Sequence, residues 1–83
     1  MEKDSRIAVI GIVVQNREET SRKLNEILSI FGNIIVGRMG IPYKEKDVSV
    51  ISIIVDGTND EIGALAGKLG SINGVKAKVA LTH

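Results

Sequence analysis

The chain has 83 residues, a formal net charge of +1, no cysteine and one histidine. A chain of this length forms one small domain that buries only about 60% of its unfolded surface, so we expect self-association to add to its stability. Disulfides, thiol catalysis and cysteine metal sites are excluded, and one histidine argues against an all-protein zinc or nickel site within a single chain.

Charge and aromatic content also restrict the partners. A near-neutral chain with one Phe and one Tyr lacks the basic surface and stacking platform of a nucleic-acid binder, so direct nucleic-acid binding is not expected. No apolar run has the roughly 18 residues of a membrane helix, and the charged residues 1–6 do not resemble a signal peptide. The sequence predicts one cytoplasmic domain over residues 1–83, without a membrane contact and with residues 1–5 disordered.

The first half of the chain predicts a strand, a helix and a second strand. Residues 6–14 are apolar on both alternating faces, as in a covered strand. Asn16 and Glu19 match a capping box, and apolar residues then repeat at helical spacing, so a helix is predicted over residues 17–31. Gly32 is predicted to end that helix in a left-handed conformation. A strand over residues 34–41 follows, and Pro42 ends it or confines it to a sheet edge.

The second half repeats this order. Residues 48–55 contain six β-branched aliphatic residues and predict a central strand that is covered on both faces. Thr58 and Glu61 form a second capping box, which opens a helix that Gly70 ends. Asn73-Gly74 then predicts a turn into a last strand over residues 75–81.

A shift of 41 residues aligns the two halves, with Val9 on Val50 and Leu24 on Leu65. Two βαβ units joined by a short charged connection give the order βαββαβ, which is the α+β, ferredoxin-like arrangement. Right-handed crossovers place both helices on one face of a four-stranded antiparallel sheet, with the first and third strands in the middle.

The central strands are apolar on both faces, but the predicted fold has too few helices to cover both faces of the sheet. Two helices cover one face of the sheet, whereas the first and third strands carry aliphatic side chains on both faces. An exposed apolar face of several hundred Å² is rare in monomers. We therefore expect a homo-oligomer, a dimer or a tetramer, that pairs through the helix-free face or through a sheet edge; a mildly apolar exposed sheet is the alternative.

The stretch from Gly37 to Tyr43 is the first candidate binding site. Glycines weaken a strand interior and often mark a bulge or a close approach of a ligand, here Gly37 and Gly40. Arg38, between them, is suited to a carboxylate or phosphate, and Tyr43 follows. A bulged edge strand with a solvated Arg38, and Tyr43 packed over the hairpin, explains the same pattern.

Gln15, Asn16 and Arg17 form the second candidate site, at the junction of the first strand and the first helix. Helix N-termini offer free amides to anions, and Arg17 adds a positive charge. Ordinary helix capping is the alternative.

The remaining candidates do not form a catalytic site. Gly63 and Gly67 give the second helix a bare stripe, either for close packing or as tolerated weak helix formers. The acids at 60–61 sit in a capping context, and His83 needs ligands from another chain to hold a metal ion. No nucleophile lies with a base in the sequence, so we expect no enzyme, no cofactor and no metal.

The sequence resembles small single-domain proteins that are proposed regulators of the iron-only hydrogenase system. The resemblance covers nearly the whole chain and is carried by several stretches together: residues 15–19, 23–28, 37–43 (Gly-Arg-Met-Gly-Ile-Pro-Tyr), 49–52, 55–58, 60–65 and 67–70. It implies a ferredoxin-like, ACT-like fold, oligomerisation and a role in regulating hydrogenase assembly or expression.

The resemblance also indicates which ligands to expect. ACT domains often bind amino acids at subunit interfaces beside the turn after the first strand, which here is residues 15–17 without the usual glycine. The fold is similar to the metal-sensing half of nickel-responsive repressors, whose histidine and cysteine ligands have no counterpart here. Two hypotheses follow: a sensor of a small anionic or amino-acid-like effector bound between subunits, or an interaction module for a regulatory or maturation protein without a small ligand.

Overall fold

The computed structural model describes residues 5–82. The elements follow the order β1 (Arg6–Gln15), α1 (Glu18–Ile30), β2 (Ile35–Tyr43), a short 3-10 turn (Lys44–Lys46), β3 (Val48–Gly57), α2 (Asn59–Gly70) and β4 (Val75–Leu81). This order is the one that the sequence predicted. The expected disorder of residues 1–5 concerns a stretch that, apart from Ser5, lies outside the described residues, and so does His83.

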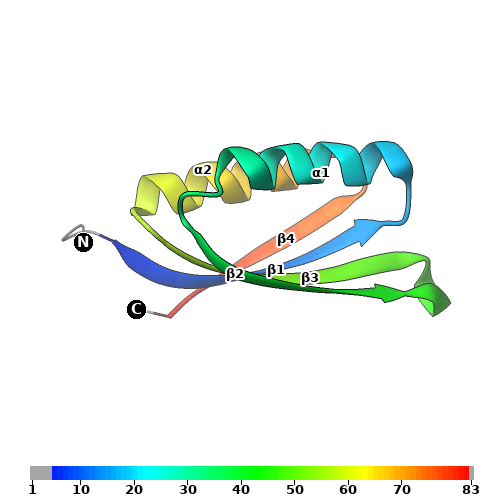
Figure 1. Cartoon of the computed structure of the whole chain (residues 1–83), viewed down its shortest axis with the longest axis horizontal. Helices are drawn as coiled ribbons and strands as arrows, with labels where there is room; N and C mark the ends of the chain where they lie inside the picture. The colour runs from blue at the N-terminus through cyan, green and yellow to red at the C-terminus, as the bar shows by residue number, and fades with distance from the viewer. Residues whose placement is uncertain (1–4, 83) are drawn as a thin grey trace.

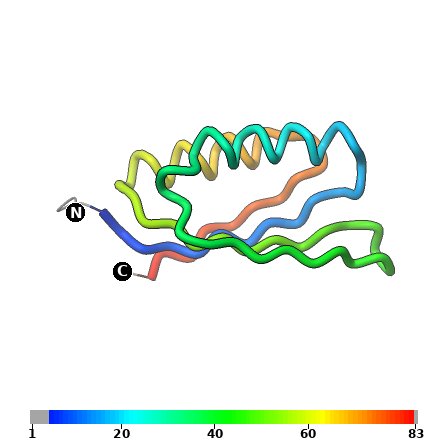
Figure 2. The backbone as a smooth tube through the Cα atoms, viewed as in Figure 1, coloured from blue at the N-terminus to red at the C-terminus, as the bar shows by residue number. Residues whose placement is uncertain are grey.

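The four strands form one antiparallel sheet in the order β2-β3-β1-β4. Both helices lie on one face of this sheet (Figure 1). The predicted ferredoxin-like fold is therefore confirmed, with β1 and β3 in the centre and β2 and β4 at the edges. The tube in Figure 2 shows the β1–α1, β2–β3 and α2–β4 connections at the same end of the sheet.

The internal repeat has a structural centre. Gly11 pairs with Ser52 across β1 and β3, and the two residues are 41 positions apart, which is the shift that aligns the two halves. The approximate two-fold axis that relates the halves therefore passes between Gly11 and Ser52, at the middle of the sheet.

The core lies between the sheet and the helices. Alternate residues of β1, from Ala8 to Val14, and of β3, from Ile51 to Val55, are buried there, as period-two alternation requires. The helices contribute Leu24 and Leu28 of α1 to this core, together with the α2 residues Ile62, Leu65 and Leu69. The alternate residues that point to the other face, including Ile7, Val13, Val50 and Ile54, are 41–45% exposed because no element covers them.

The two predicted helix starts have different outcomes. In α2 the capping box is confirmed: the Glu61 amide donates to Thr58 Oγ1 at 3.1 Å, and the Thr58 amide donates to Glu61 Oε1 at 2.8 Å. In α1 the predicted box is wrong, because the N-cap residue is Arg17 and no side chain caps it. Asn16 is held elsewhere: its backbone amide donates to the Asp47 carbonyl and its side-chain amide to Asp47 Oδ1.

The end of α1 also differs from the prediction. Among residues 5–82, only Asp47 and Gly74 have positive φ, so Gly32 does not take the left-handed conformation expected of it. The Gly32 amide donates to the Ser29 carbonyl at 3.2 Å, which tightens the last turn and replaces a left-handed cap. The predicted Asn73-Gly74 turn is confirmed, with a φ of 94° at Gly74.

Strand β2 is longer than predicted. It continues through Pro42, which pairs with Ser49, to Tyr43, and this is possible because β2 is an edge strand whose outer amides need no partner. The register shifts between Ile35 and Gly37, so the glycine-containing strand does carry a bulge.

The glycines of α2 are exposed, and an added Cβ at Gly63 or Gly67 would meet nothing within 4 Å.

The capping box of α2 predicts the effect of one substitution. Thr58→Ala should lower the free energy of unfolding by about 1 kcal/mol, because the Glu61 amide loses its acceptor. Arg17→Ala, at a helix start without a side-chain cap, should change the free energy of unfolding by less than about 0.5 kcal/mol. Urea unfolding at one fixed protein concentration measures both; equal losses would contradict the assigned role of Thr58.

Two glycine substitutions should act in opposite directions. Gly74→Ala should destabilise the protein by about 1–3 kcal/mol, because φ is positive and the new Cβ would lie 3.0 Å from Gln15 Oε1. Gly63→Ala should stabilise it by about 1 kcal/mol, because the position is helical and has open space. Thermal unfolding compares them, and a stable Gly74→Ala variant would contradict the geometry of this turn.

Candidate functional site

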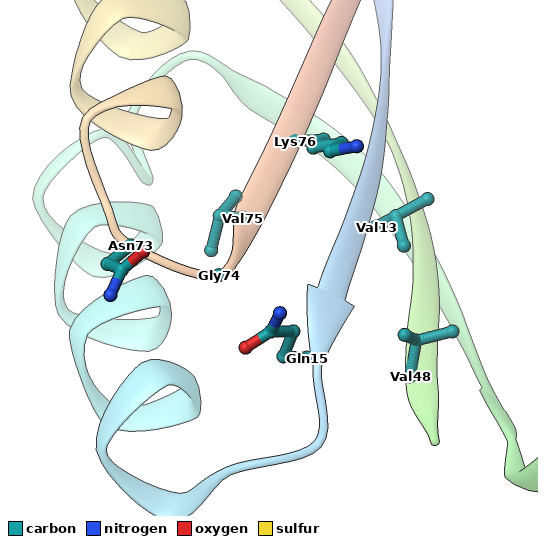
Figure 3. Close-up of a pocket in the computed structure, with 7 residues that line it drawn as sticks. All are labelled: Val13, Gln15, Val48, Asn73, Gly74, Val75 and Lys76. Carbon is teal, nitrogen blue, oxygen red and sulfur yellow. The ribbon is translucent and has the colours of Figure 1, made fainter. Parts of the chain in front are cut away.

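The predicted site residues fall into two groups. Gln15 pairs with Val48, which pairs with Tyr43, so these three residues form one row across β1, β3 and β2. Val48 and Tyr43 lie on the helix-free face, because they alternate with residues of the helix side. The Gln15 side chain instead turns toward Gly74, away from the direction of Val13 (Figure 3). The structure thus brings Gln15 and Tyr43 to the same end of the sheet, with Val48 between them.

Arg38 does not join that group. It pairs with the fully buried Ile53, so the register puts Arg38 on the helix side of the sheet, at the exposed edge of β2. Its guanidinium makes no hydrogen bond or ion pair with the described residues. An added Cβ would meet nothing within 4 Å at Gly37, and at Gly40 it would meet Ile51 Cγ1 at 3.4 Å and the Val50 carbonyl oxygen at 3.9 Å, both ordinary contact distances. Close packing within the chain therefore does not account for these two glycines.

Asn16 and Arg17 differ in whether their side chains have a partner in the structure. The Asn16 side chain is engaged with Asp47, at 3.2 Å, and ties the end of β1 to the β2–β3 hairpin. Arg17 is exposed, and its backbone amide donates to the Gln15 carbonyl at 2.8 Å. Of the three predicted residues at this junction, Gln15 is the one that lines a cavity.

A cavity of about 390 Å³ lies at this end of the sheet, between the ends of β1 and β3 and the start of β4. Its volume lies within the range of small-molecule sites. It is lined by Val13, Gln15, Val48, Asn73, Gly74, Val75 and Lys76. Figure 3 shows Gln15 between β1 and the Asn73-Gly74 turn, and Lys76 extending from β4 toward β1.

The backbone explains why the cavity forms there. The Gln15 amide donates to the Gly74 carbonyl at 2.8 Å, which joins the end of β1 to the turn that precedes β4. Gly74 has positive φ, and its missing Cβ leaves room for the Gln15 side chain. Lys76 pairs with Val13, so its side chain lies on the same face of the sheet as Val13.

The polar groups of the cavity have no partners in the described part of the chain. The side chains of Gln15, Asn73 and Lys76 form no hydrogen bond or ion pair with residues 5–82, while Val13, Val48 and Val75 supply apolar walls. One ammonium and two amides around apolar walls can bind a small molecule that carries an anionic group. The lining contains no carboxylate, hydroxyl, thiol or imidazole that could act as a general acid or base.

Sequence reasoning missed most of this lining. Asn73 and Gly74 were interpreted only as a turn, and Lys76 only as part of an alternating strand. The ferredoxin-like order could have found them, because it places the start of β4 beside the end of β1.

Two further features are absent from the described residues. No helix within residues 5–82 is long and apolar enough to cross a membrane. No three His, Cys, Asp or Glu side chains in that range are grouped so that they could hold a metal ion.

Comparison with solved structures identifies one near relative and several proteins that share the fold. The structure of the uncharacterized protein TM1266 from Thermotoga maritima has 39% sequence identity and a TM-score of 0.93, with 95% of this chain and 99% of that chain covered. The C-terminal domain of the MgtC protein from Mycobacterium tuberculosis has 9% identity and a TM-score of 0.73, with 99% of this chain and 93% of that one covered.

The apo form of CPII from Thiomonas intermedia K12, a nitrogen regulatory PII-like protein, has 13% identity and a TM-score of 0.51, with 94% of this chain and 96% of that one covered. At these identities the MgtC and CPII similarities concern the fold alone. No curated protein gives a significant match.

Family membership follows from a match to the sequence model of a protein family. The sequence model of the TM1266-like family, whose proposed role is iron-only hydrogenase system regulator, matches residues 6–79. This span includes every strand and helix of the fold except the last two residues of β4. The chain therefore belongs to the TM1266-like family of iron-only hydrogenase system regulators.

Proposed function

We propose that this chain is a non-enzymatic regulatory domain that senses a small anionic or amino-acid-like effector in the cavity at the end of β1. The observation that carries this proposal is a cavity lined by three exposed polar residues, Gln15, Asn73 and Lys76, whose side chains have no hydrogen-bond or ion-pair partner among residues 5–82. The regulatory role agrees with the family, and the absence of acid–base groups from the cavity lining favours binding over catalysis.

The chemistry of the lining defines the class of effector. Lys76 supplies the only formal charge in the cavity, so the ligand carries a negative group, such as a carboxylate. The amides of Gln15 and Asn73 each offer donors and an acceptor, which suits a ligand with a further polar group. Val13 and Val48 form an apolar wall for a short carbon chain.

A second candidate function is an interaction module for a regulatory or maturation protein, without a small ligand. The edge strand β2 favours it, because Val36, Met39 and Ile41 are 58–68% exposed. An exposed apolar edge strand can pair with a strand of another protein. Arg38 lies on the same strand, so Arg38→Ala should weaken such a partner contact and leave the cavity unchanged.

Lys76→Gln tests the effector site. We expect a probe set of the amino acids and of short dicarboxylates, screened by thermal shift and isothermal titration, to contain binders. Lys76→Gln should weaken their binding by about 10-fold or more, because it removes a charge-assisted hydrogen bond worth roughly 1.5–3 kcal/mol.

Lys78→Gln provides the matched control. Lys78 lies two residues further along β4 on the same face but does not line the cavity. Its substitution should change the affinity by no more than about two-fold, since only a screened long-range charge is lost. Equal losses in both variants, or no binding of any probe to the unmodified protein, would contradict the proposed effector site.

A further inference from the structure

We infer that two copies of the chain pack through the helix-free faces of their sheets, about a two-fold axis parallel to β1 and β3, so that Tyr43 of each copy closes the effector cavity of the other. This inference rests on the proposed function for the identity of the cavity as a binding site. The packing itself is derived from the composition, the symmetry and the charges of the helix-free face.

The helix-free face has the composition of an interface. Its apolar residues, each 41–67% exposed, include Ile7, Val13, Met39, Ile41, Val50 and Ile54. With about 3.3 Å per residue along the strands and about 4.8 Å between strands, the face measures roughly 30 by 19 Å. Two such faces in contact would bury about 1,100 Å², which exceeds the roughly 1,000 Å² expected of a biological interface.

The middle of the face is hollow and symmetric. Gly11 and Ser52 lie side by side there, and an added Cβ at Gly11 would meet nothing within 4 Å. Larger pairs flank them on both sides, Val9 with Ile54 and Val13 with Val50. The relief of the face is thus the same on both sides of its centre.

Charge selects the direction of the two-fold axis. On this face β4 carries Lys76 and Lys78, whereas β2 presents Met39, Ile41 and Tyr43 and no charged side chain. An axis perpendicular to the strands would stack β4 on β4 and oppose the lysines of the two copies. An axis parallel to the strands stacks β4 on β2, where the lysine stems cover apolar side chains and like charges stay apart.

The same axis completes the cavity. Lys76 and Ile41 lie in one row across the sheet, and Tyr43 lies one row further toward the Gln15 end. When β2 of one copy crosses β4 of the other, its Tyr43 therefore lies over the cavity beside Lys76. The aromatic ring shields the ammonium group from water and contributes a cation–π contact. A ligand bound there would contact both subunits.

Crosslinking tests the packing without any ligand. The natural chain has no cysteine, so the variant Ile41→Cys with Lys76→Cys carries the only thiols. Packed sheets lie about 10 Å apart, so a bismaleimide with a span of about 8 Å should join Ile41→Cys of one copy to Lys76→Cys of the other. The same two positions within one chain are about 14 Å apart, across three strand spacings, which is beyond the reach of the reagent.

The single-cysteine variants decide between the orientations. Under the inferred axis, Ile41→Cys alone and Lys76→Cys alone should give no covalent dimer, because each position faces a different strand of its partner. Covalent dimers from either single variant, or none from the double variant, would overturn the inferred packing. Native mass spectrometry of the unmodified chain should show an even-numbered oligomer, and a monomer would overturn it equally.

Tyr43→Ala tests the closure of the cavity. The probe is the one whose binding Lys76→Gln weakens. Tyr43→Ala should weaken the binding of this probe by at least about five-fold while the mass of the dimer persists. Met39→Ala should change the affinity for the probe by no more than about two-fold. Val50→Lys should dissociate the dimer and lower the affinity as Tyr43→Ala does, with a circular dichroism spectrum like that of the unmodified protein.

The failures of the two proposals are distinguishable. If Lys76→Gln weakens binding but Tyr43→Ala does not, the effector site stands and its closure by a second copy is wrong. If no probe binds while the crosslinking pattern appears as expected, the packing stands and the effector function is wrong.

Discussion

The antiparallel pairing of β1 with β3 is the interaction on which the rest of this structure depends. Both strands are aliphatic on both faces, and their register opposes Ile10 to Ile53 in the core. A slip of one residue would exchange the two faces of a strand. Here such a slip would bring Gly11 into the core in place of an isoleucine and so remove packing. Because two helices cover only one face, the same pairing also leaves the other face apolar and exposed.

The candidate site is a consequence of where these strands end. The end of β1 is tied to the α2–β4 turn by the Gln15 amide and to the β2–β3 hairpin by Asn16, so three connections meet at one end of the sheet. Between them the backbone leaves a cavity whose amides and ammonium group have no partner in residues 5–82. No buried side-chain polar atom in that range lacks a hydrogen-bond partner, and the three polar side chains of the cavity are exposed.

Fold alone does not assign this protein a task. The same arrangement occurs in the MgtC C-terminal domain and in CPII at identities of 9% and 13%, and such folds host many functions. The proposed role of its family is regulation of the iron-only hydrogenase system. Under the proposed packing, occupancy of the cavity and association of the subunits are linked equilibria, so that each strengthens the other.

The sequence by itself determined the order of the elements, the internal repeat, the central strands and the capping box of α2. These features depend on residues close together in the chain or on periodicity, and period-two alternation and local capping leave direct traces in the sequence.

The tertiary structure decided what depends on distant residues. Asn16 resembles a helix cap, but it bonds to Asp47, which is 31 positions away. Gly32 needs no left-handed turn, since the last turn of α1 tightens instead. Arg38 and Gln15, both predicted at a site, are separated because the sheet register puts Arg38 on the edge strand β2, whereas Lys76 is brought to the end of β1 by the pairing of β4 with β1. Such groupings follow from strand pairing, which no local pattern records.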